Sequence, residues 1–381
     1  MRVIAAFTFA LPVAALGQPY PIGNRSVTFF DADRNRNIPT DVYYPAQAAG
    51  ANAEVAEGSF PVLVIGHGFV MGTGAYANLR NHFVPLGYIV ALPTTEGGVP
   101  PNHGAFGLDI AHVSTALQAA GGEPASPFYG HVAPATALMG HSMGGGSSFL
   151  AAAGNTSITT VVNFAAAETN PSAVAACAQV QVPTLMFAGS NDCVTPIVEH
   201  QGPMYEALTV PCRAFISITG GGHCYFADYN FNCSLGELTC SPSPSIERAE
   251  QHDAVNDFAT LWLGHFLKGE SGALEAFLDS TAQTTRAVCT TTCELSTGMA
   301  VQEGGELPLI WPTVADDRFT VRMPGATFRM DVLDAQGRLV LSIADLQDRA
   351  IVDAARLPQG TYLVRVMAGA SRAIGRLVVA R

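Results

Sequence analysis

The stretch GHSMG at residues 140–144 decides the fold of this chain, because it places a G-x-S-x-G motif directly after the β-favouring run ATALM at residues 135–139. A strand that feeds a sharp turn into a helix forces the serine into a strained, exposed position, and the small flanking residues let backbone pass close on each side. The glycine- and alanine-rich residues 144–153 can continue as that helix. The pattern predicts a nucleophile elbow, with Ser142 as the nucleophile.

A serine nucleophile needs a base to take its proton and an acid to hold that base, and both can be placed after Ser142. The apolar run at residues 182–188 has the length of a strand, and Asp192 follows it in a loop. The next strand-like run, residues 214–218, is followed by His223. An α/β-hydrolase carries its triad in this order, at the carboxyl edge of the sheet. The sequence therefore predicts Ser142, Asp192 and His223 as a catalytic triad.

An oxyanion hole needs two backbone N–H groups aimed at the developing negative charge. We expect one from Met143, directly after the nucleophile, and the other from Phe69, in the loop that follows the apolar run at residues 61–65. The complete set predicts carboxylic ester hydrolysis through an acyl-enzyme, without a cofactor. Two alternatives stay open: a catalytically silent surface or binding protein on the same scaffold, and an amide or peptide hydrolase that uses the same residues.

Residues 60–280 resemble an α/β-hydrolase of the dienelactone-hydrolase and cutinase-like group, which includes polyester-degrading cutinases. The segments FPVLVIGHGF, GHSMGG, VPTLMFAGSNDCVTP and GGH carry this resemblance. It implies a mostly parallel sheet flanked by helices, an ester substrate, and a second role for Phe69 as a wall of the acyl site. Polyester hydrolases resemble each other in a tryptophan after the strand that precedes the acid strand, whereas here residues 165–167 are all alanine. We therefore expect no stacking platform for an aromatic polymer.

Composition and the first residues bear on partners and location. The 381-residue chain has a formal net charge of −12, and no basic patch is present to meet nucleic-acid phosphates. Arg2 precedes an apolar stretch at residues 3–16, which predicts a secretory signal peptide over residues 1–17, with a buried N-terminal strand as the alternative. This stretch is too short to span a bilayer, so we expect an exported protein without stable membrane insertion.

All eight cysteines lie between Cys177 and Cys293, and an even number in an exported chain predicts disulfides. The absence of a C-x-x-C pair argues against zinc, and no metal is expected. Cys177 and Cys212 precede their strands, at the edge of the sheet opposite to Cys193. A strand separates the two edges by about 17–20 Å, whereas a disulfide requires Cα atoms within about 7 Å. This separation argues against a bridge between Cys193 and Cys212.

The positions of the cysteines relative to the strands also indicate which of them pair. Cys193 and Cys224 each directly follow a proposed triad member, so we expect a bridge that joins the acid loop to the base loop. Related polyester hydrolases have a comparable bridge near these loops, at other offsets from the triad. Cys177 and Cys212 lie together at the opposite edge, and the remaining four cysteines most simply pair locally, Cys233 with Cys240 and Cys289 with Cys293.

The chain changes character after residue 280, where the catalytic domain of residues 18–280 is expected to end. Helical spacing of apolar residues at 256–266 predicts a final helix over the sheet. The Thr- and Gly-rich residues 281–306 predict a linker. Residues 307–381 alternate short strand-like runs with turns, which predicts a small β-sandwich.

Residues 307–381 resemble the C-terminal sorting domain of the type IX secretion system of Bacteroidetes. The segments WPT, DRFTV, VLD with GRLV, GTYLVRV and the final LVV carry this resemblance, while the usual Pro-Asn-Pro is replaced by residues 312–314, PTV. The resemblance implies the secretion machinery as a partner. It also implies a secreted or cell-surface protein, exported through the periplasm of a Gram-negative bacterium. A carbohydrate- or polymer-binding module is the structural alternative.

Overall fold

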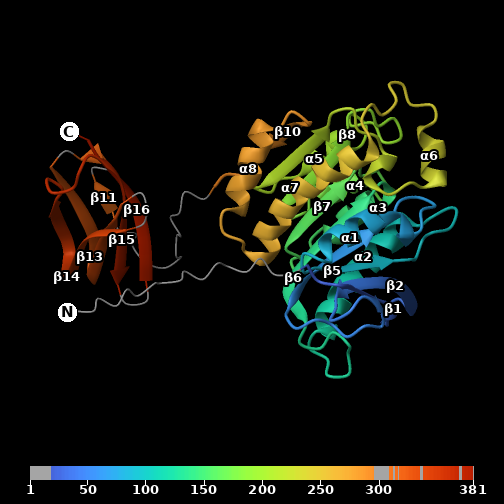
Figure 1. Ribbon diagram of the computed structural model, residues 1–381, viewed down its shortest axis with the longest axis horizontal. Helices are drawn as coiled ribbons and strands as arrows, with labels where there is room; N and C mark the ends of the chain where they lie inside the picture. Colours follow the sequence, from blue (N-terminus) through green and yellow to red (C-terminus); the bar gives the residue numbers. More distant parts are fainter. Residues whose placement is uncertain are drawn as a thin grey trace, which may run out of the picture. The chain divides into compact units, whose positions relative to one another are not determined.

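The computed structural model of the chain describes residues 19–295, 309–311, 314–315, 317–334, 338–368 and 371–380. The predicted signal peptide lies outside the described residues, as do residues 296–306 of the predicted linker. The chain divides after Cys293 into two compact units, and each is described by itself (Figure 1).

A ten-stranded sheet forms the centre of the first unit, in the order β10-β9-β8-β7-β6-β4-β5-β2-β1-β3. The strands from β4 to β9 pair in parallel, whereas β2 and β10 run antiparallel to their inner neighbours β5 and β9. The α/β class predicted from the sequence is therefore confirmed. The strands are β1 (Ile22–Asp31), β2 (Arg36–Pro45), β3 (Gly50–Ala51), β4 (Phe60–Gly66), β5 (Ile89–Pro93), β6 (Val132–His141), β7 (Thr160–Phe164), β8 (Thr184–Gly189), β9 (Arg213–Ile218) and β10 (Ala287–Thr291).

Two hydrophobic cores lie on the two faces of this sheet. Successive side chains of β4 alternate between them, because neighbouring residues in a strand point to opposite faces: Val62 and Val64 join one core, and Leu63 and Ile65 the other. The first core is closed by α2 (His103–Ala120), α3 (Met143–Ala152), α4 (Ala173–Cys177) and α5 (Gln201–Ala207). The second is closed by η1 (Thr73–Tyr76), α1 (Ala77–Phe83), α7 (Arg248–Lys268) and α8 (Ala273–Gln283).

The helix predicted at residues 256–266 is the centre of α7. Glu250 accepts a hydrogen bond from the backbone N–H of Glu247 at 2.8 Å, which satisfies one free donor at the start of the helix. Gly269 ends it in the left-handed conformation, with φ of 65°. Trp262 is fully buried, and its indole N–H donates to Thr160 Oγ1 of β7 at 2.8 Å. This helix is not the final one, because α8 follows it.

The predicted linker begins too early. Residues 281–283 complete α8, and Ala287–Thr291 form β10, which pairs antiparallel with β9 at the edge of the sheet. Small polar residues are typical of linkers, but threonine and valine also favour strands, and pairing with β9 decides between the two. A disulfide from Cys293 to Cys212 then fixes the end of this segment.

The second unit is built from β strands, as predicted. Its described strands belong to one hydrogen-bonded sheet, antiparallel except for the parallel pair of β12 and β16. Tyr362, Val364 and Val366 alternate into its core, as the two-residue period of a strand requires. The strands are β11 (Leu309–Trp311), β12 (Val314–Ala315), β13 (Arg318–Leu333), β14 (Leu339–Asp353), β15 (Gly360–Ala368) and β16 (Ser371–Val379).

Candidate active site

Ser142 stands at the turn between β6 and α3 in a strained conformation. Its φ of 56° and ψ of −124° are unusual for a residue with a side chain. Its backbone is held on both sides: the N–H donates to Phe164 O at 3.1 Å, and the C=O accepts from Gly146 at 3.1 Å and from Ala167 at 2.9 Å. These bonds fix the serine at the carboxyl edge of the sheet, where β6 ends.

Glycine is required around Ser142 because backbone segments pass very close. A Cβ on Gly140 would lie 2.2 Å from the carbonyl oxygen of Gly144, and a Cβ on Gly144 would lie 2.2 Å from the carbonyl oxygen of Gly66. Both distances are far below any real Cβ contact. The G-x-S-x-G spacing therefore lets the first turn of α3 pack directly on the ends of β4 and β6.

His223 and Asp192 meet in the loops after β9 and β8. His223 Nδ1 lies 2.8 Å from Asp192 Oδ2, and both side chains are almost fully buried. Because an ionised carboxylate only accepts hydrogen bonds, Nδ1 carries the proton and Nε2 is the free acceptor of the neutral ring. The structure thus places the predicted acid and base together, in the orientation that a general base needs.

The Asp192 carboxylate is anchored by its own loop. Its Oδ1 accepts from the backbone N–H groups of Val194 and Thr195, each at 2.8 Å. Burial acts to raise the pKa of Asp192, but the charge and hydrogen bond of His223 and the two donors of Thr195 outweigh it, so the pKa lies below its usual range. Asp192 therefore stays ionised beside the imidazole.

Thr195 is a residue of this site that sequence reasoning missed. Its buried hydroxyl donates to Asp192 Oδ2 at 2.8 Å and lies 3.0 Å from His223 Nδ1. Gln201 Nε2 donates to Thr195 Oγ1 at 3.1 Å and to Ala166 O at 2.7 Å. The signal in the sequence was a threonine three residues after the acid, in a loop at a strand end, where threonine side chains commonly make local hydrogen bonds.

Ser142 and His223 are not yet hydrogen-bonded to each other. Among the described residues, Ser142 Oγ has no hydrogen-bond partner, although its residue is only 8% exposed. Catalytic hydrogen bonds in ligand-free enzymes are often long and shorten when substrate binds. The free hydroxyl and the free Nε2 are thus the two groups left to engage a substrate.

The predicted oxyanion donors also have free N–H groups. Among the described residues, neither Phe69 N nor Met143 N donates to a protein acceptor. The N–H of Gly68, one residue earlier, is already used, because it donates to Tyr76 Oη at 2.6 Å. This bond leaves Phe69 as the donor of its loop.

Tyr76 and His141 connect the oxyanion loop, which follows β4 and carries Phe69, to the base loop, which follows β9 and carries His223. Tyr76 Oη lies 3.0 Å from His141 Nδ1, and His141 Nε2 lies 3.0 Å from the carbonyl oxygen of His223. A carbonyl only accepts, so Nε2 donates to it and Nδ1 accepts the tyrosine proton. The chain of bonds therefore runs from Gly68 through Tyr76 and His141 to His223.

His141 is a structural, uncharged histidine. Complete burial, together with the charge of His223, lowers the pKa of His141 to about 3. Burial likewise raises the pKa of Tyr76 above its usual range. The imidazole of His141, whose ring centre lies 4.8 Å from that of His223, is thus neutral and does not repel a protonated His223.

The predicted bridge between Cys193 and Cys224 is wrong. Cys193 is bonded to Cys240, and Cys224 is bonded to Cys233. Cys233 lies in the short helix α6 (Phe231–Glu237), and Cys240 lies three residues beyond the end of that helix. Both come after η2 (Cys224–Phe226) in the chain. Each pairs with a different strand-end loop.

The predicted bridge between Cys289 and Cys293 is also wrong. Four residues of extended chain span about 13 Å, and Cys289 lies within β10. Cys293 instead bonds to Cys212 of the neighbouring strand end, at the edge opposite to Cys193, as the topology argument allowed. Cys177 and Cys289 are free thiols, which corrects their assignment to disulfides.

The alanines after β7 pack under the nucleophile elbow. Ala165 and Ala166 are fully buried, and Ala165 adopts a positive φ of 43°. A Cβ on Gly145 would lie 2.8 Å from the Cα of Ala166, and a Cβ on Gly146 2.2 Å from the carbonyl oxygen of Ala167. This segment therefore offers no aromatic face to a substrate.

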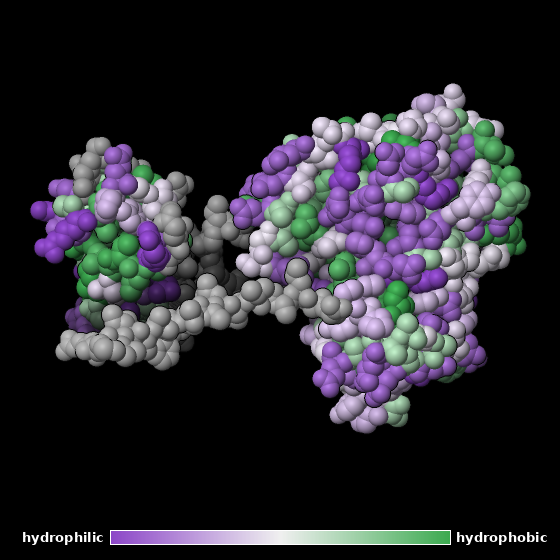
Figure 2. Space-filling view, viewed as in Figure 1, coloured by the Kyte–Doolittle hydropathy of each residue, from purple (hydrophilic) through white to green (hydrophobic). Residues whose placement is uncertain are grey.

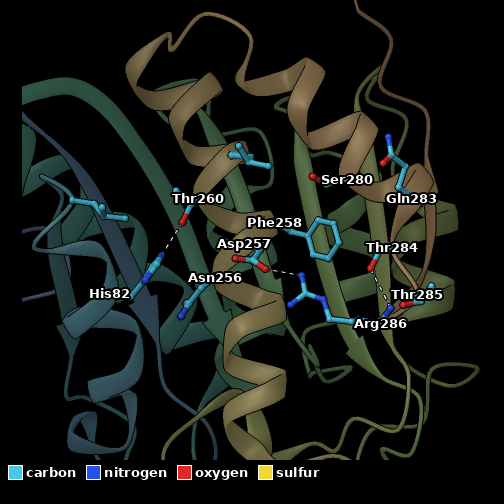
Figure 3. A pocket seen from close by; sticks show the side chains of 12 residues that line it. His82, Asn256, Asp257, Phe258, Thr260, Ser280, Gln283, Thr284, Thr285 and Arg286 are labelled. Carbon is cyan, nitrogen blue, oxygen red and sulfur yellow. Dashed lines mark hydrogen bonds and ion pairs between the residues drawn. The ribbon is translucent and has the colours of Figure 1, made fainter. Parts of the chain in front are cut away.

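A groove beside α7 and α8 lies apart from these residues (Figure 3). Its volume is about 820 Å³, and it contains an ion pair between Arg286 and Asp257 at 2.6 Å and a hydrogen bond between His82 and Thr260 at 2.7 Å. No residue of the predicted triad lines it. Within the described part of the chain, no helix has the length and apolarity needed to cross a membrane, and no cluster of three metal-ligating side chains occurs.

Comparisons with known proteins agree with this geometry. A family model described as PET hydrolase-like matches residues 37–241, which include Ser142, Asp192 and His223. A model described as a secretion system C-terminal sorting domain matches residues 309–380, so the C-terminal unit is a sorting domain. The chain is 24% identical over 232 residues to a bis(hydroxyethyl) terephthalate hydrolase of Streptomyces coelicolor, across 60% of this chain and 68% of that protein. Because the first match covers more than half of the chain, this protein belongs to the PET hydrolase-like family and is a carboxylic ester hydrolase.

Proposed function

We propose that this protein is a secreted serine esterase that uses Ser142, His223 and Asp192 as its catalytic triad. The observation that carries the proposal is the 2.8 Å bond between His223 Nδ1 and Asp192 Oδ2, at the strand ends beside a serine in a strained turn. A carboxylate that fixes the proton on Nδ1 leaves Nε2 as the base for a hydroxyl. The turn of this loop uses Oδ1 of Asp192, whereas Oδ2 is directed at the imidazole and at Thr195.

The reaction is acyl transfer to water. Ser142 Oγ attacks the ester carbonyl carbon while its proton passes to His223 Nε2, and Asp192 stabilises the imidazolium. The N–H groups of Phe69 and Met143 hold the oxyanion of the tetrahedral intermediate. Collapse of the intermediate breaks the bond to the alcohol oxygen, which takes the proton from Nε2. Water then attacks the acyl-serine, gives its proton to Nε2, and the acid leaves as the serine recovers its proton.

The substrate class is an uncharged carboxylic ester, with short aliphatic esters preferred over crystalline aromatic polyester. The related Streptomyces protein is named for an ester of terephthalic acid, which supports an ester at the reacting position. Residues 165–167 pack beneath the elbow and supply no ring on which an aromatic acid could stack. The same residues also serve amide hydrolysis, so the substrate panel includes anilides.

The proposal that this protein is secreted rests on its sorting domain. Its match covers nearly all of the C-terminal unit, and the sequence begins with the pattern of a signal peptide. The three disulfides suit an oxidising compartment. We place the protein outside the cell or on its surface, with the secretion machinery as the partner of the C-terminal unit.

A substrate panel tests the function. Nitrophenyl esters of increasing acyl length, an aliphatic polyester film, an aromatic polyester film and matching anilides are offered to the wild type and to Ser142→Ala. We expect ester turnover by the wild type, highest for short aliphatic acyl groups, and a loss of about 10⁴–10⁶-fold in the variant. Faster cleavage of the anilides, or equal rates of wild type and variant, would contradict the proposal.

A further inference from the structure

An exposed apolar segment lies at the rim of the proposed active site. Residues 229–240, here called the α6 segment, carry Tyr229, Phe231, Leu235 and Leu238 with exposed fractions between 51 and 75%. Side chains of this kind are ordinarily scattered singly over a surface. In Figure 2, hydrophobic side chains gather at the edge of the molecule where Figure 1 labels α6. The concentration of four within ten residues marks a contact surface.

The α6 segment is joined to all three loops of the proposed site. Cys233 is bonded to Cys224, the residue after the base, and Cys240 to Cys193, the residue after the acid. The amide of Asn232 donates to the carbonyl oxygen of Val70 at 3.0 Å, next to the proposed oxyanion donor Phe69. The surface is thus continuous with the place where the ester is cleaved.

Two further exposed apolar side chains lie on the other loops of the proposed site. Phe69, on the oxyanion loop, is 47% exposed, and Val198, on the loop after the acid, is 81% exposed. Glu237 Oε1 accepts from the backbone N–H of Cys224 at 2.8 Å, which turns the charged side chain of α6 inward and away from this face. Six exposed apolar side chains therefore lie on the α6 segment and on the loops that carry the proposed site.

The α6 segment is a fixed surface and not a closing lid. Two disulfides and the bonds of Asn232 and Glu237 hold a stretch of only twelve residues. A closed lid would bury its apolar face against the site, whereas these side chains are exposed. The apolar side chains of the α6 segment therefore need no rearrangement to contact a partner.

Charge decides which partner fits. Residues 224–245 contain no lysine or arginine, and their ionisable side chains include the acidic Asp228 and Glu237. The guanidinium of Arg248, which follows them, is bonded to the carbonyl oxygens of Cys224 and Ala227 and lies over the ring of Tyr225. An anionic phospholipid surface is recognised by clusters of cations, which this segment lacks. An uncharged, apolar surface is the complementary partner.

We infer that the α6 segment docks the protein on the chains of an uncharged, water-insoluble aliphatic polyester, so that an ester of the polymer reaches Ser142. This inference rests on the proposed function and assigns to the segment a role separate from the chemistry. Phe231, Leu235 and Leu238 would contact the polymer beyond the scissile ester. Each apolar side chain transferred from water contributes to adsorption in proportion to the area it buries.

The test compares two triple variants in the full-length protein. The docking variant is Phe231→Ser/Leu235→Ser/Leu238→Ser. The matched control is Phe30→Ser/Leu108→Ser/Val288→Ser, which removes apolar groups of similar exposure from β1, α2 and β10. Circular dichroism and thermal unfolding verify that both variants fold.

Two readouts are measured for each protein. The first is the rate on aliphatic polyester particles divided by the rate on a soluble nitrophenyl ester. The second is adsorption to the same particles of the Ser142→Ala form, in which catalysis plays no part. We expect the docking variant to lose about tenfold in both readouts, as three weakened apolar contacts imply, and the control variant to match the wild type.

Several results would overturn the inference. A docking variant with the wild-type ratio and adsorption would do so, and so would a control variant that loses as much. Stronger wild-type binding to anionic phospholipid vesicles or to neutral triglyceride emulsions, or a wild-type dimer that the docking variant breaks, would assign the surface to another partner. Absence of ester hydrolysis by the wild type, together with intact adsorption, would instead contradict only the proposed function.

Discussion

The hydroxyl oxygen of Tyr76 lies 3.0 Å from Nδ1 of His141, and the same oxygen accepts the N–H of Gly68 at 2.6 Å. Tyr76 comes from η1, His141 from the end of β6, and Gly68 from the oxyanion loop. His141 in turn donates to the backbone of His223. One buried hydroxyl thus sets the relative position of three loops of the site.

Tyr76→Phe is predicted to slow catalysis without removing any reacting group. The change leaves the buried Gly68 N–H and His141 Nδ1 without their partner, and a small displacement of the oxyanion loop costs about 10- to 100-fold in kcat. The KM for a small soluble ester should change little.

Tyr44→Phe is the matched control, since this buried hydroxyl donates to Ala53 O at 2.7 Å, far from the triad in the sequence and the sheet. Both variants should lose similar stability. An equal fall of kcat in the two would show that Tyr76 acts only through stability.

Thr195→Val is predicted to lower kcat by about 5- to 100-fold, because Asp192 Oδ2 and Gln201 Nε2 lose a buried hydrogen-bond partner. Thr195→Ser keeps the hydroxyl and should restore most of the rate.

Thr184→Val supplies the comparison for Thr195. Its buried hydroxyl donates to Val182 O at 3.1 Å, at the start of β8 and away from the loop of Asp192. Wild-type kinetics are expected there. If the serine variant at position 195 were as slow as the valine variant, shape and not the hydroxyl would be responsible.

The disulfides are predicted to differ in their contribution to stability. The loops closed by Cys212–Cys293, Cys193–Cys240 and Cys224–Cys233 span sequence separations of 81, 47 and 9. Chain entropy then predicts losses of about 4.5, 4 and 2.5 kcal/mol when each pair is replaced by alanine. Urea unfolding under non-reducing conditions measures these free energies, and a largest loss for the shortest loop would contradict the order.

The disulfides of the α6 segment are also predicted to affect activity. Loss of Cys193–Cys240 or Cys224–Cys233 should lower the rate at 25 °C as well as the stability, because each bridge adjoins a proposed triad residue. Loss of Cys212–Cys293, at the opposite edge of the sheet, should lower stability while the rate at 25 °C stays near that of the wild type. Equal activity losses in all three variants would contradict this division.

Asp331→Asn is predicted to destabilise the sorting domain at neutral pH by about 1–3 kcal/mol. Hydrogen bonds from Ser342, Arg365 and Arg329 lower the pKa of the buried Asp331 to about 2. Since the usual value is about 3.9, the ionised carboxylate stabilises the fold fully above about pH 4, and this contribution is lost as the pH falls towards 2. The difference between wild type and variant should therefore shrink over that window.

Hydrogen exchange of β13 and β15 in the full-length protein localises this effect. Exposed Asp345 offers the matched variant Asp345→Asn, whose free energy of unfolding at neutral pH should match that of the wild type. A difference at Asp331 that grew on acidification would mean that the carboxylate is not the stabilising group.

The sequence predicted the sheet and the loops that carry the three proposed triad residues, because both follow from local patterns. Apolar runs of strand length define β6, β8 and β9, and Ser142, Asp192 and His223 occupy the loops directly after them. Parallel strands bring their carboxyl ends to one edge, so position along the chain becomes proximity in space.

The missed features depend on contacts between distant segments. The α6 segment folds back to place Cys233 and Cys240 beside Cys224 and Cys193, and no local pattern encodes that return. Likewise β10 exists because β9 offers a free edge, although its own composition is typical of a linker. Tyr76 joins the site across 65 residues through one hydroxyl, which leaves no trace in its sequence neighbourhood.

Covalent trapping of the nucleophile tests the central claim most directly. A fluorophosphonate is added to the wild type, to His223→Ala and to Ser147→Ala, a control at a buried serine one turn further along α3, and the labelled peptide is mapped by mass spectrometry. We predict one adduct, on Ser142, formed at the wild-type rate in the Ser147 variant and slowed by several orders of magnitude in the His223 variant. Labelling of another residue, or labelling of Ser142 at the same rate without His223, would contradict the account.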